Sequence, residues 1–197
     1  MSIDEVPSEA KLPTKYGDFV IRVFHESETG LDHVALTLGE MSGPDPVLIR
    51  VHSECFTGDV LHSMRCDCGE QLDLAMERIA KEGKGIIVYS RQEGRGIGLV
   101  NKLKAYNLQD DGLDTVEANV ALGFSAELRN YENAAKILKN LGVKKIELMT
   151  NNPSKVEDLS KEGFDVIKTK HLPEPNKENI EYLKTKAEKM RHQFTID

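Results

Sequence analysis

Three cysteines stand close together in the sequence and have the spacing of metal ligands. Cys55, Cys66 and Cys68 are the only cysteines of the chain. An odd number of cysteines in one short segment does not suit a disulfide framework, which uses cysteines in pairs and in an oxidising compartment. Thiolates are soft ligands that favour zinc, so the sequence predicts one zinc ion per subunit at this cluster.

The fourth ligand decides whether such a zinc site is structural or catalytic. His52 and His62 lie near the cysteines in the sequence and could close a tetrahedral structural site. If neither closes it, the fourth position is left to water, which is typical of catalytic zinc. Three ordinary buried thiols are a further interpretation. The neighbouring charged residues Arg65 and Asp67 argue against that interpretation.

A glycine-rich segment downstream of the cysteines is suited to bind an anion. Gly94, Gly96 and Gly98 lie between an expected strand and an expected helix. Backbone N–H groups of such a loop, together with the N-terminus of the next helix, favour a phosphate. The pattern is neither a Walker loop nor a dinucleotide-binding fingerprint. A flexible turn with a solvated basic rim is the alternative interpretation.

The segment 149–155 repeats this arrangement of strand, turn and helix. Thr150 ends the expected strand, Ser154 is a candidate cap of the next helix, and Lys155 falls in its first turn. A hydroxyl, a helix N-terminus and a lysine together suit a phosphate or a ribose. A routine capped helix with a surface lysine is the alternative.

The elements that must position these residues follow an α/β pattern. Residues 1–10 are polar and we expect them to be loose, and the Lys/Glu-rich chain of residues 174–197 predicts a solvated helix or polar tail. Apolar periodicity predicts strands at 17–24, 33–40, 46–53, 85–90 and 144–150 and helices at 71–82, 99–108, 131–141 and 154–162.

This order predicts an α/β fold with a mixed sheet and flanking helices. The N-terminal part is β-rich, and strand–loop–helix units make up the second half. We see no linker, so we expect one domain over residues 1–197.

Composition excludes several classes of function. The chain has 197 residues, 39% of them hydrophobic and 30% charged, which is typical of a folded globular protein. No apolar run approaches the roughly 20 residues of a membrane span, and the N-terminus lacks the features of a signal peptide. We therefore expect a cytoplasmic protein with no membrane partner. A net charge of −7 argues against a nucleic-acid partner.

Six motifs follow one another along the chain: RVHSEC (50–55), RCDCG (65–69), RQEGRGIGL (91–99), the 102–119 segment with its AY and DTVEAN, LGF (122–124) and LMTNNPSK (148–155). Together they resemble the motifs of the GTP cyclohydrolase II family, the zinc hydrolases that commit GTP to riboflavin biosynthesis. The resemblance extends over nearly the whole chain and has no large insertions. It implies that the imidazole ring of GTP is opened and that formate and pyrophosphate leave. The remaining product is 2,5-diamino-6-(5-phosphoribosylamino)pyrimidin-4-one.

The resemblance also implies roles for individual residues. The three cysteines match the zinc ligands, and Tyr106 is a candidate to steer or protonate the opening ring. A triphosphate substrate implies Mg²⁺, and the family implies a homodimer. The positions that match GTP contacts are Arg50, Val51, His52, Ser53, Glu54, Gln71, Glu93, Gly94, Arg95, Thr115, Thr150 and Lys155.

Two catalytic positions follow the LGF motif. Glu127 stands where the family has an aspartate as proton acceptor, and Arg129 matches the family's nucleophile toward the α-phosphate. A guanidinium has a pKa above about 12 and is almost never a free base, so an electrostatic role for Arg129 is physically favoured. Near the C-terminus, Arg191 replaces a family glycine.

Two other functions are compatible with these features. The Glu127 change is compatible with a homologue that stops at the formamide or retains pyrophosphate. A non-catalytic nucleotide-binding homologue, or a zinc-dependent nucleic-acid module, is the second alternative. The acidic net charge argues against nucleic acid, and the retained Tyr106 and phosphate-binding segments argue against an inactive sensor.

Overall fold

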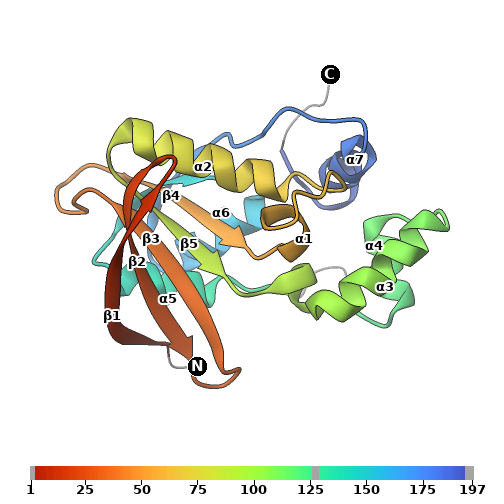
Figure 1. Cartoon of the computed structure of the whole chain (residues 1–197), viewed down its shortest axis with the longest axis horizontal. Helices are drawn as coiled ribbons and strands as arrows, with labels where there is room; N and C mark the ends of the chain where they lie inside the picture. The colour runs from red at the N-terminus through yellow and green to blue at the C-terminus, as the bar shows by residue number, and fades with distance from the viewer. Residues whose placement is uncertain (1–2, 126–128, 194–197) are drawn as a thin grey trace. The chain divides into compact units, whose positions relative to one another are not determined.

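The structure, a computed structural model, describes residues 3–125 and 129–193 of the chain (Figure 1). It divides into two compact units that alternate along the sequence. Unit 1 comprises Met1–His52, Leu72–Arg91 and Asn130–His171, and unit 2 comprises Ser53–Gln71, Gln92–Arg129 and Leu172–Asp197. The expectation of a single domain stays a prediction.

Unit 1 is built on one mixed sheet, as the sequence predicts. The seven strands lie in the order β1-β2-β3-β5-β4-β6-β7. Neighbours in the series from β1 through β2 and β3 to β5 are antiparallel, whereas β4, β6 and β7 are parallel. The strands are β1 (Ile3–Thr14), β2 (Gly17–Glu26), β3 (Leu31–Leu38), β4 (Val47–Ser53), β5 (Gly85–Ser90), β6 (Lys145–Met149) and β7 (Asp165–Thr169).

Both edge strands were hidden from the sequence patterns. The expectation that residues 1–10 are loose is wrong from Ile3 onward, because β1 pairs with β2 along its length. Strand β7 was not expected, although it pairs in register with β6. Backbone hydrogen bonds make an edge strand, so its sequence can be polar where one side faces solvent.

The predicted helices are present, with ends shifted by a few residues. Asn152, and not Ser154, caps α6, because its side chain accepts the Ser154 backbone N–H at 3.0 Å. Apolar periodicity did not predict the short helix α1 or the helix α4. The helices are α1 (Phe56–Asp59), α2 (Cys68–Glu82), α3 (Gly98–Asp110), α4 (Thr115–Ala121), α5 (Glu132–Asn140), α6 (Pro153–Lys161) and α7 (Ile180–Lys189), with a 3₁₀ turn η1 at Glu93–Gly96.

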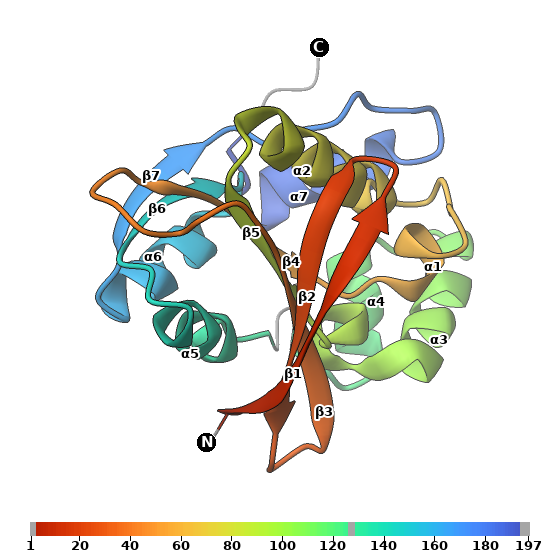
Figure 2. The same cartoon turned by 60° about the vertical axis from the view of Figure 1, so that its left-hand side comes forward.

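The central strands of unit 1 are apolar on both sides because helices cover both faces of the sheet (Figure 2). Successive residues of a strand point to opposite faces. In β5, Ile86 and Val88 pack in one cluster with residues of α5 and α6, whereas Ile87 packs in the other. The second cluster contains Ala75 and Ile79 of α2. This two-sided core fixes the strand ends from which site residues project.

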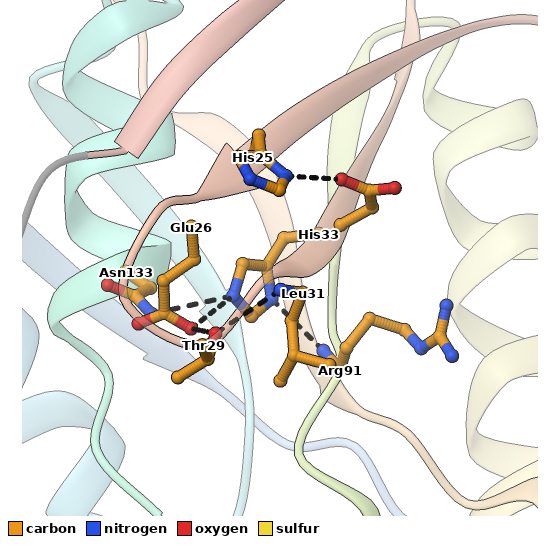
Figure 3. A network of polar contacts seen from close by, with 8 residues as sticks. His25, Glu26, Thr29, Leu31, His33, Arg91 and Asn133 are labelled. Carbon is orange, nitrogen blue, oxygen red and sulfur yellow. Dashed lines mark hydrogen bonds and ion pairs between the residues drawn. The ribbon is translucent and has the colours of Figure 1, made fainter.

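A buried polar network lies at the end of the β2–β3 hairpin (Figure 3). The Glu26 carboxylate accepts hydrogen bonds from Asn133 Nδ2 at 2.6 Å and from Thr29 Oγ1 at 2.5 Å. His33 Nε2 lies 3.3 Å from the same carboxylate, and His33 Nδ1 accepts the Arg91 backbone N–H at 3.1 Å. The network therefore holds the chain where it leaves β5.

The charge of Glu26 is favoured by these partners. Burial alone would raise its pKa, but the hydrogen bonds from Thr29, Asn133 and His33 outweigh burial and hold the pKa of Glu26 below its ordinary value. Because His33 Nδ1 accepts a backbone N–H, the proton of the neutral ring is on Nε2, facing Glu26.

Unit 2 contains α1, η1, α3, α4 and α7. Helix α3 lies against η1 and α4, and α4 lies against α7. Asp114 caps α4 by accepting the backbone N–H groups of Val116 and Glu117, and Glu117 completes a capping box. The cap fixes the start of α4, where Thr115 stands.

The C-terminal segment contains a helix, one of the two expected alternatives, but this helix is not solvated on all sides. In α7, Leu183 is fully buried and Lys186 is 7% exposed, so one face of this helix is packed. Just past the helix end, Arg191 has φ 58, in the left-handed region. Glycine adopts this conformation without steric cost, which explains why the family resemblance has glycine there. No helix in the described ranges is long and apolar enough to cross a membrane.

Candidate metal centre and active site

The three cysteine thiols gather in unit 2, as their spacing predicts. The Sγ atoms of Cys55, Cys66 and Cys68 all lie within 4.8 Å of one another. Cys55 and Cys66 are buried and Cys68 is partly buried. Among the described His, Cys, Asp and Glu side chains, only these three form such a group. Neither histidine candidate joins it, so the thiols leave a fourth tetrahedral position open.

A glycine lets the backbone approach the thiols closely. A Cβ at Gly58 would lie 3.0 Å from Cys66 Sγ and 3.2 Å from Cys55 Sγ. The turn is held by Asp59, whose carboxylate accepts the Cys55 backbone N–H at 3.0 Å. Three converging thiols around a space that admits no side chain fit the soft ligand set of a zinc ion.

Lys102 provides the positive charge next to the thiols. Its Nζ lies 3.0 Å from Cys55 Sγ and 2.8 Å from Glu93 Oε1. Burial alone would lower the pKa of Lys102, but the Cys55 thiolate and the Glu93 carboxylate outweigh burial and raise it. This lysine therefore stays charged and offsets part of the thiolate charge.

The thiols share their protons unequally. The hydrogen bond from Cys66 lowers the pKa of the Cys55 thiol far below its ordinary value, and Lys102 adds to this. The same contact raises the pKa of Cys66 to about 12. Cys55 is thus the thiolate of the group before a metal binds, and a thiolate is the form that binds metal.

A buried ion pair holds the loop between two of the thiols. Asp67 stands between Cys66 and Cys68 and is 2% exposed. Its carboxylate accepts hydrogen bonds from Lys186 Nζ at 2.5 Å and from Gln71 Nε2 at 2.5 Å. Gln71, a predicted GTP contact, therefore directs its amide to Asp67 in this structure.

A cavity of about 680 Å³, counted with the space at its mouth, opens beside the thiols within unit 2. The cavity brings together eight of the predicted site residues with the three cysteines. These are Ser53, Glu54, Glu93, Gly94, Arg95, Tyr106, Thr115 and Arg129.

The glycine-rich loop offers a side chain, rather than its first backbone amide, to an anion. The Gly94 N–H donates to Glu93 Oε1 at 2.7 Å and is therefore engaged. Arg95 adopts φ 61, which is unusual for a residue with a side chain. Its Nη1 atom is buried and has no hydrogen-bond partner among the described residues. A buried, unsatisfied guanidinium nitrogen at the cavity is suited to bind an anion.

Tyr106 lies at the cavity with its hydroxyl 3.1 Å from Thr57 Oγ1. The Arg65 guanidinium lies over its ring, 4.9 Å from the centroid. Burial raises the pKa of Tyr106 above its ordinary value, so the hydroxyl keeps its proton at neutral pH. The predicted site tyrosine is thus a neutral phenol on the cavity wall.

Comparison with known proteins decides the family. The family described as GTP cyclohydrolase II matches residues 5–171. The chain belongs to the GTP cyclohydrolase II family. It is therefore an enzyme, a hydrolase that acts on GTP in riboflavin biosynthesis.

Relatives of this GTP cyclohydrolase II match it over nearly its full length. The GTP cyclohydrolase-2 of Shewanella amazonensis is 54% identical over 196 residues, which cover 99% of this chain and 95% of the relative. The protein of the same name from Aeromonas hydrophila is 53% identical and covers 98% and 99% of the two chains. That from Haemophilus influenzae is 53% identical and covers 95% and 88%.

One solved structure shows a weak likeness. A two-domain 3,4-dihydroxy-2-butanone 4-phosphate synthase from A. baumannii has a TM-score of 0.41 and 22% identity to this GTP cyclohydrolase II. The match covers 75% of this chain and 34% of that chain.

The remaining predicted GTP contacts of the cyclohydrolase lie in unit 1, near the ends of β4 and β6. Arg50 Nη1 donates to the Met149 carbonyl at 2.8 Å, and Lys155 Nζ donates to the Val51 carbonyl at 2.7 Å. Thr150 Oγ1 accepts the Asn152 backbone N–H at 3.1 Å. Because β4 and β6 are parallel neighbours, their carboxyl ends bring these residues together.

His52 and Glu127 complete the predicted set. His52 is buried in unit 1, and its ring stacks on Tyr89 with 5.5 Å between centroids. Glu127 lies outside the described residues, so the structure says nothing of its position. Arg129, two positions later, lines the cavity of the cyclohydrolase.

Among the cavity residues of this GTP cyclohydrolase II that sequence reasoning missed, Lys102 and Tyr182 bear most directly on the site. Lys102 had a usable signal, because it stands four residues before Tyr106 and so shares a helix face with it. Tyr182 had a weaker one, since it lies in the C-terminal segment that the composition indicated to be solvated. Lysine and tyrosine are common residues, so residue type alone does not identify Lys102 and Tyr182 as site residues. Their neighbours in the folded chain identify them.

Proposed function

We propose that this enzyme uses a zinc ion held by Cys55, Cys66 and Cys68 to hydrolyse GTP to formate, pyrophosphate and 2,5-diamino-6-(5-phosphoribosylamino)pyrimidin-4-one. The observation that carries the proposal is a cluster of three thiols, with an open fourth position, on the wall of a cavity that also holds an unsatisfied arginine. The cavity is thus suited to a substrate with an electrophilic ring at one end and phosphates at the other.

The ring half of the reaction needs an activated water. Zinc bound to the thiols would supply a Lewis acid that brings the pKa of water to about 7. Three waters balance the reaction: one adds at C8 as the ring opens, one releases formate from the formamide, and one cleaves the α–β phosphoanhydride. Lys102 offsets the thiolate charge, and Tyr106 donates its hydroxyl proton to a nitrogen released by the ring.

The phosphate half of the reaction needs positive charge. Arg95 and Arg129 both line the cavity, and the buried Nη1 atom of Arg95 has no hydrogen-bond partner among the described residues. In our proposal both stabilise the charge that develops on the phosphate oxygens, and Glu127 accepts the proton of the attacking water. Mg²⁺ bound with the triphosphate would supply further positive charge that offsets the charge of the phosphates.

The other GTP contacts are proposed on the family resemblance. Ser53, Glu54, Glu93, Gly94 and Thr115 are supported by their place on the cavity wall. For the rest, no observation of a ligand supports the role, and their side chains have protein partners in this structure. These are Arg50, Val51, His52, Gln71, Thr150 and Lys155.

We propose a homodimer as the working form. Unit 2 exposes several large apolar side chains on α1, α3 and the segment after α1. Exposed apolar patches are typical of protein interfaces. The set comprises Phe56, Val60, Leu61, Met64, Leu99, Val100 and Leu103. A cytoplasmic location stays a prediction of the sequence.

The residue at position 127 favours one alternative, a reaction with an altered product. Because Glu127 replaces the family's aspartate, the enzyme could stop at the formamide or retain pyrophosphate. Incubating the protein with GTP, Zn²⁺ and Mg²⁺ and measuring formate and pyrophosphate separately distinguishes these outcomes. Stoichiometric release of both products supports the full reaction, whereas a product that keeps either group supports the alternative.

The zinc assignment has its own test in Cys66→Ser. We expect this variant to lose its zinc and its formate release, because a hydroxyl is a poor soft ligand. Metal content is measured by elemental analysis, and formate by an enzyme-coupled assay. The wild-type protein stripped by a chelator and reloaded with zinc is the control. Full formate release by metal-free wild type would refute the assignment.

A further inference from the structure

We infer that the C-terminal helix α7 holds the zinc-binding loop in its ligating geometry, with Lys186 as the positioning residue that acts through Asp67. Helix α7 lies beyond residues 5–171, where the family match ends. The inference rests on the proposed zinc site. It assigns a role in metal binding to α7, which the sequence indicated only as a solvated helix or polar tail.

The direct contact is the ion pair between Lys186 and Asp67. The two side chains are 9% and 2% exposed, and the Nζ and Oδ1 atoms are 2.5 Å apart. Asp67 is the single residue between Cys66 and Cys68, so its side chain and both thiols belong to one tight loop. A fixed Asp67 carboxylate therefore restricts the backbone from which both thiols project. A buried charge pair of this kind has few alternative positions for its partners.

A second contact joins the same helix to the substrate cavity. Tyr182 lines the cavity, and two cationic side chains lie near its ring. The Lys186 Nζ is 4.4 Å from the ring centroid, and the Arg95 guanidinium carbon is 6.0 Å from it. The spacing of 182 and 186 is one helical turn, so both side chains extend from the same face of α7.

A third contact fixes the far end of the helix. Lys189 pairs with Asp114 and with Glu117, the two residues of the α4 capping box. Leu183, next to the contact face, is fully buried. The helix is therefore anchored along its length, so that Lys186 can resist displacement of the loop.

The expected consequence concerns zinc affinity more than substrate binding. Partners that orient metal ligands typically change metal affinity by 10- to 100-fold when they are removed. Neither Lys186 nor Asp67 is among the residues that line the cavity. Loss of the pair should therefore weaken zinc binding and leave the KM for GTP of the zinc-saturated enzyme within about twofold of wild type.

The experiment measures the zinc dissociation constant of the full-length protein by competition with a chromogenic chelator. Lys186→Met, Asp67→Asn and the double variant are compared with wild type. Lys184→Met is the matched control, because Lys184 is an exposed lysine of the same helix whose Nζ pairs with Glu181. We expect each single variant to bind zinc about 10- to 100-fold more weakly. The double variant should be no weaker than either single, and the control should match wild type.

The outcomes separate this inference from the proposed function. If wild type binds no zinc, the proposed metal site fails. If wild type binds zinc and Lys186→Met binds it equally well, the inference fails while the metal site stands. Additive effects in the double variant would also overturn it, because Lys186 would then act independently of Asp67. If Lys186→Met does not fold, Asp67→Asn, which keeps the side-chain volume, and Lys186→Arg, which keeps the charge, give the answer. Wild-type zinc affinity in Asp67→Asn would then contradict the inference. A Lys186→Arg variant that binds zinc no more tightly than Asp67→Asn would contradict it as well.

Discussion

At the scale of single residues, the candidate zinc site depends on the small size of Gly58 as well as on its three thiols. A Cβ at Gly58 would lie 3.0 Å from Cys66 Sγ, a contact so tight that the thiol would have to shift by a few tenths of an ångström. Lys102 contributes a charge at a similar distance from Cys55. Neither residue binds the metal, yet each limits how the three thiols can be arranged.

Gly58→Ala tests this limit directly. The added methyl group must displace Cys66 or Cys55, so we expect zinc affinity to fall at least about tenfold. Overpacking should also lower the free energy of unfolding by about 1–3 kcal/mol. Zinc affinity is measured by chelator competition and stability by denaturant unfolding. Gly30→Ala, whose Cβ would meet nothing within 4 Å, is the control for zinc affinity. Unchanged zinc binding in Gly58→Ala would mean that the thiols are loosely held.

At the scale of elements, the polar network of Glu26, His33 and Asn133 joins the β2–β3 hairpin to α5 and to the end of β5 (Figure 3). The chain continues from Arg91 into the segment that carries Glu93 and Arg95. The network thus holds the chain just before the residues that line the cavity.

Glu26 makes the stability of unit 1 depend on pH. Its pKa in the folded protein is below the ordinary value of 4.5. Its contribution is therefore complete above that value and is lost as the pH falls through the lowered folded pKa. Glu26→Gln should cost about 1–3 kcal/mol at neutral pH, through its hydrogen bonds to Thr29 and Asn133. It should also flatten the loss of stability on acidification.

Denaturant unfolding of wild type and Glu26→Gln between pH 3 and pH 7 measures this effect. Glu28→Gln, on the exposed turn of the same hairpin, controls for the loss of one carboxylate. Parallel stability curves for wild type and Glu26→Gln would show that the network does not favour the charged carboxylate.

At the scale of the whole molecule, surface composition is the informative feature. The chain carries a net charge of −7, which favours solubility. Against this background, Val100 is 69% exposed and Leu61 is 61% exposed. Exposing large apolar side chains to water has a free-energy cost. Association with a second copy of the chain would remove this cost by burying them.

Val100→Glu should therefore convert the proposed homodimer to monomers, because the new charge would be buried at the interface without a partner. Light scattering coupled to size-exclusion chromatography measures the mass. Ser160→Glu, which adds the same charge at an exposed position of α6, is the control and should stay dimeric. A monomeric wild-type protein, or a dimeric Val100→Glu, would contradict the proposed interface.

The sequence by itself determined the features that are local. The cysteine cluster, the glycine-rich loop, the predicted strands and the family could all be identified from residue types at short spacings. Each of these depends on neighbours within a few positions or on an alternation of apolar residues, and both are written in the order of the chain. The mixed α/β class followed from the order of those elements.

Only the tertiary structure decided which distant residues meet. Lys186 and Asp67 are 119 positions apart, and Lys102 and Cys55 are 47 apart. Edge strand β7 and helix α7 have weak patterns of their own, because pairing with β6 and burial of Leu183 define them. Common residues such as lysine acquire a specific role only from what surrounds them after folding. Local patterns therefore predicted the metal ligands, whereas the charges and contacts that hold those ligands required the three-dimensional fold.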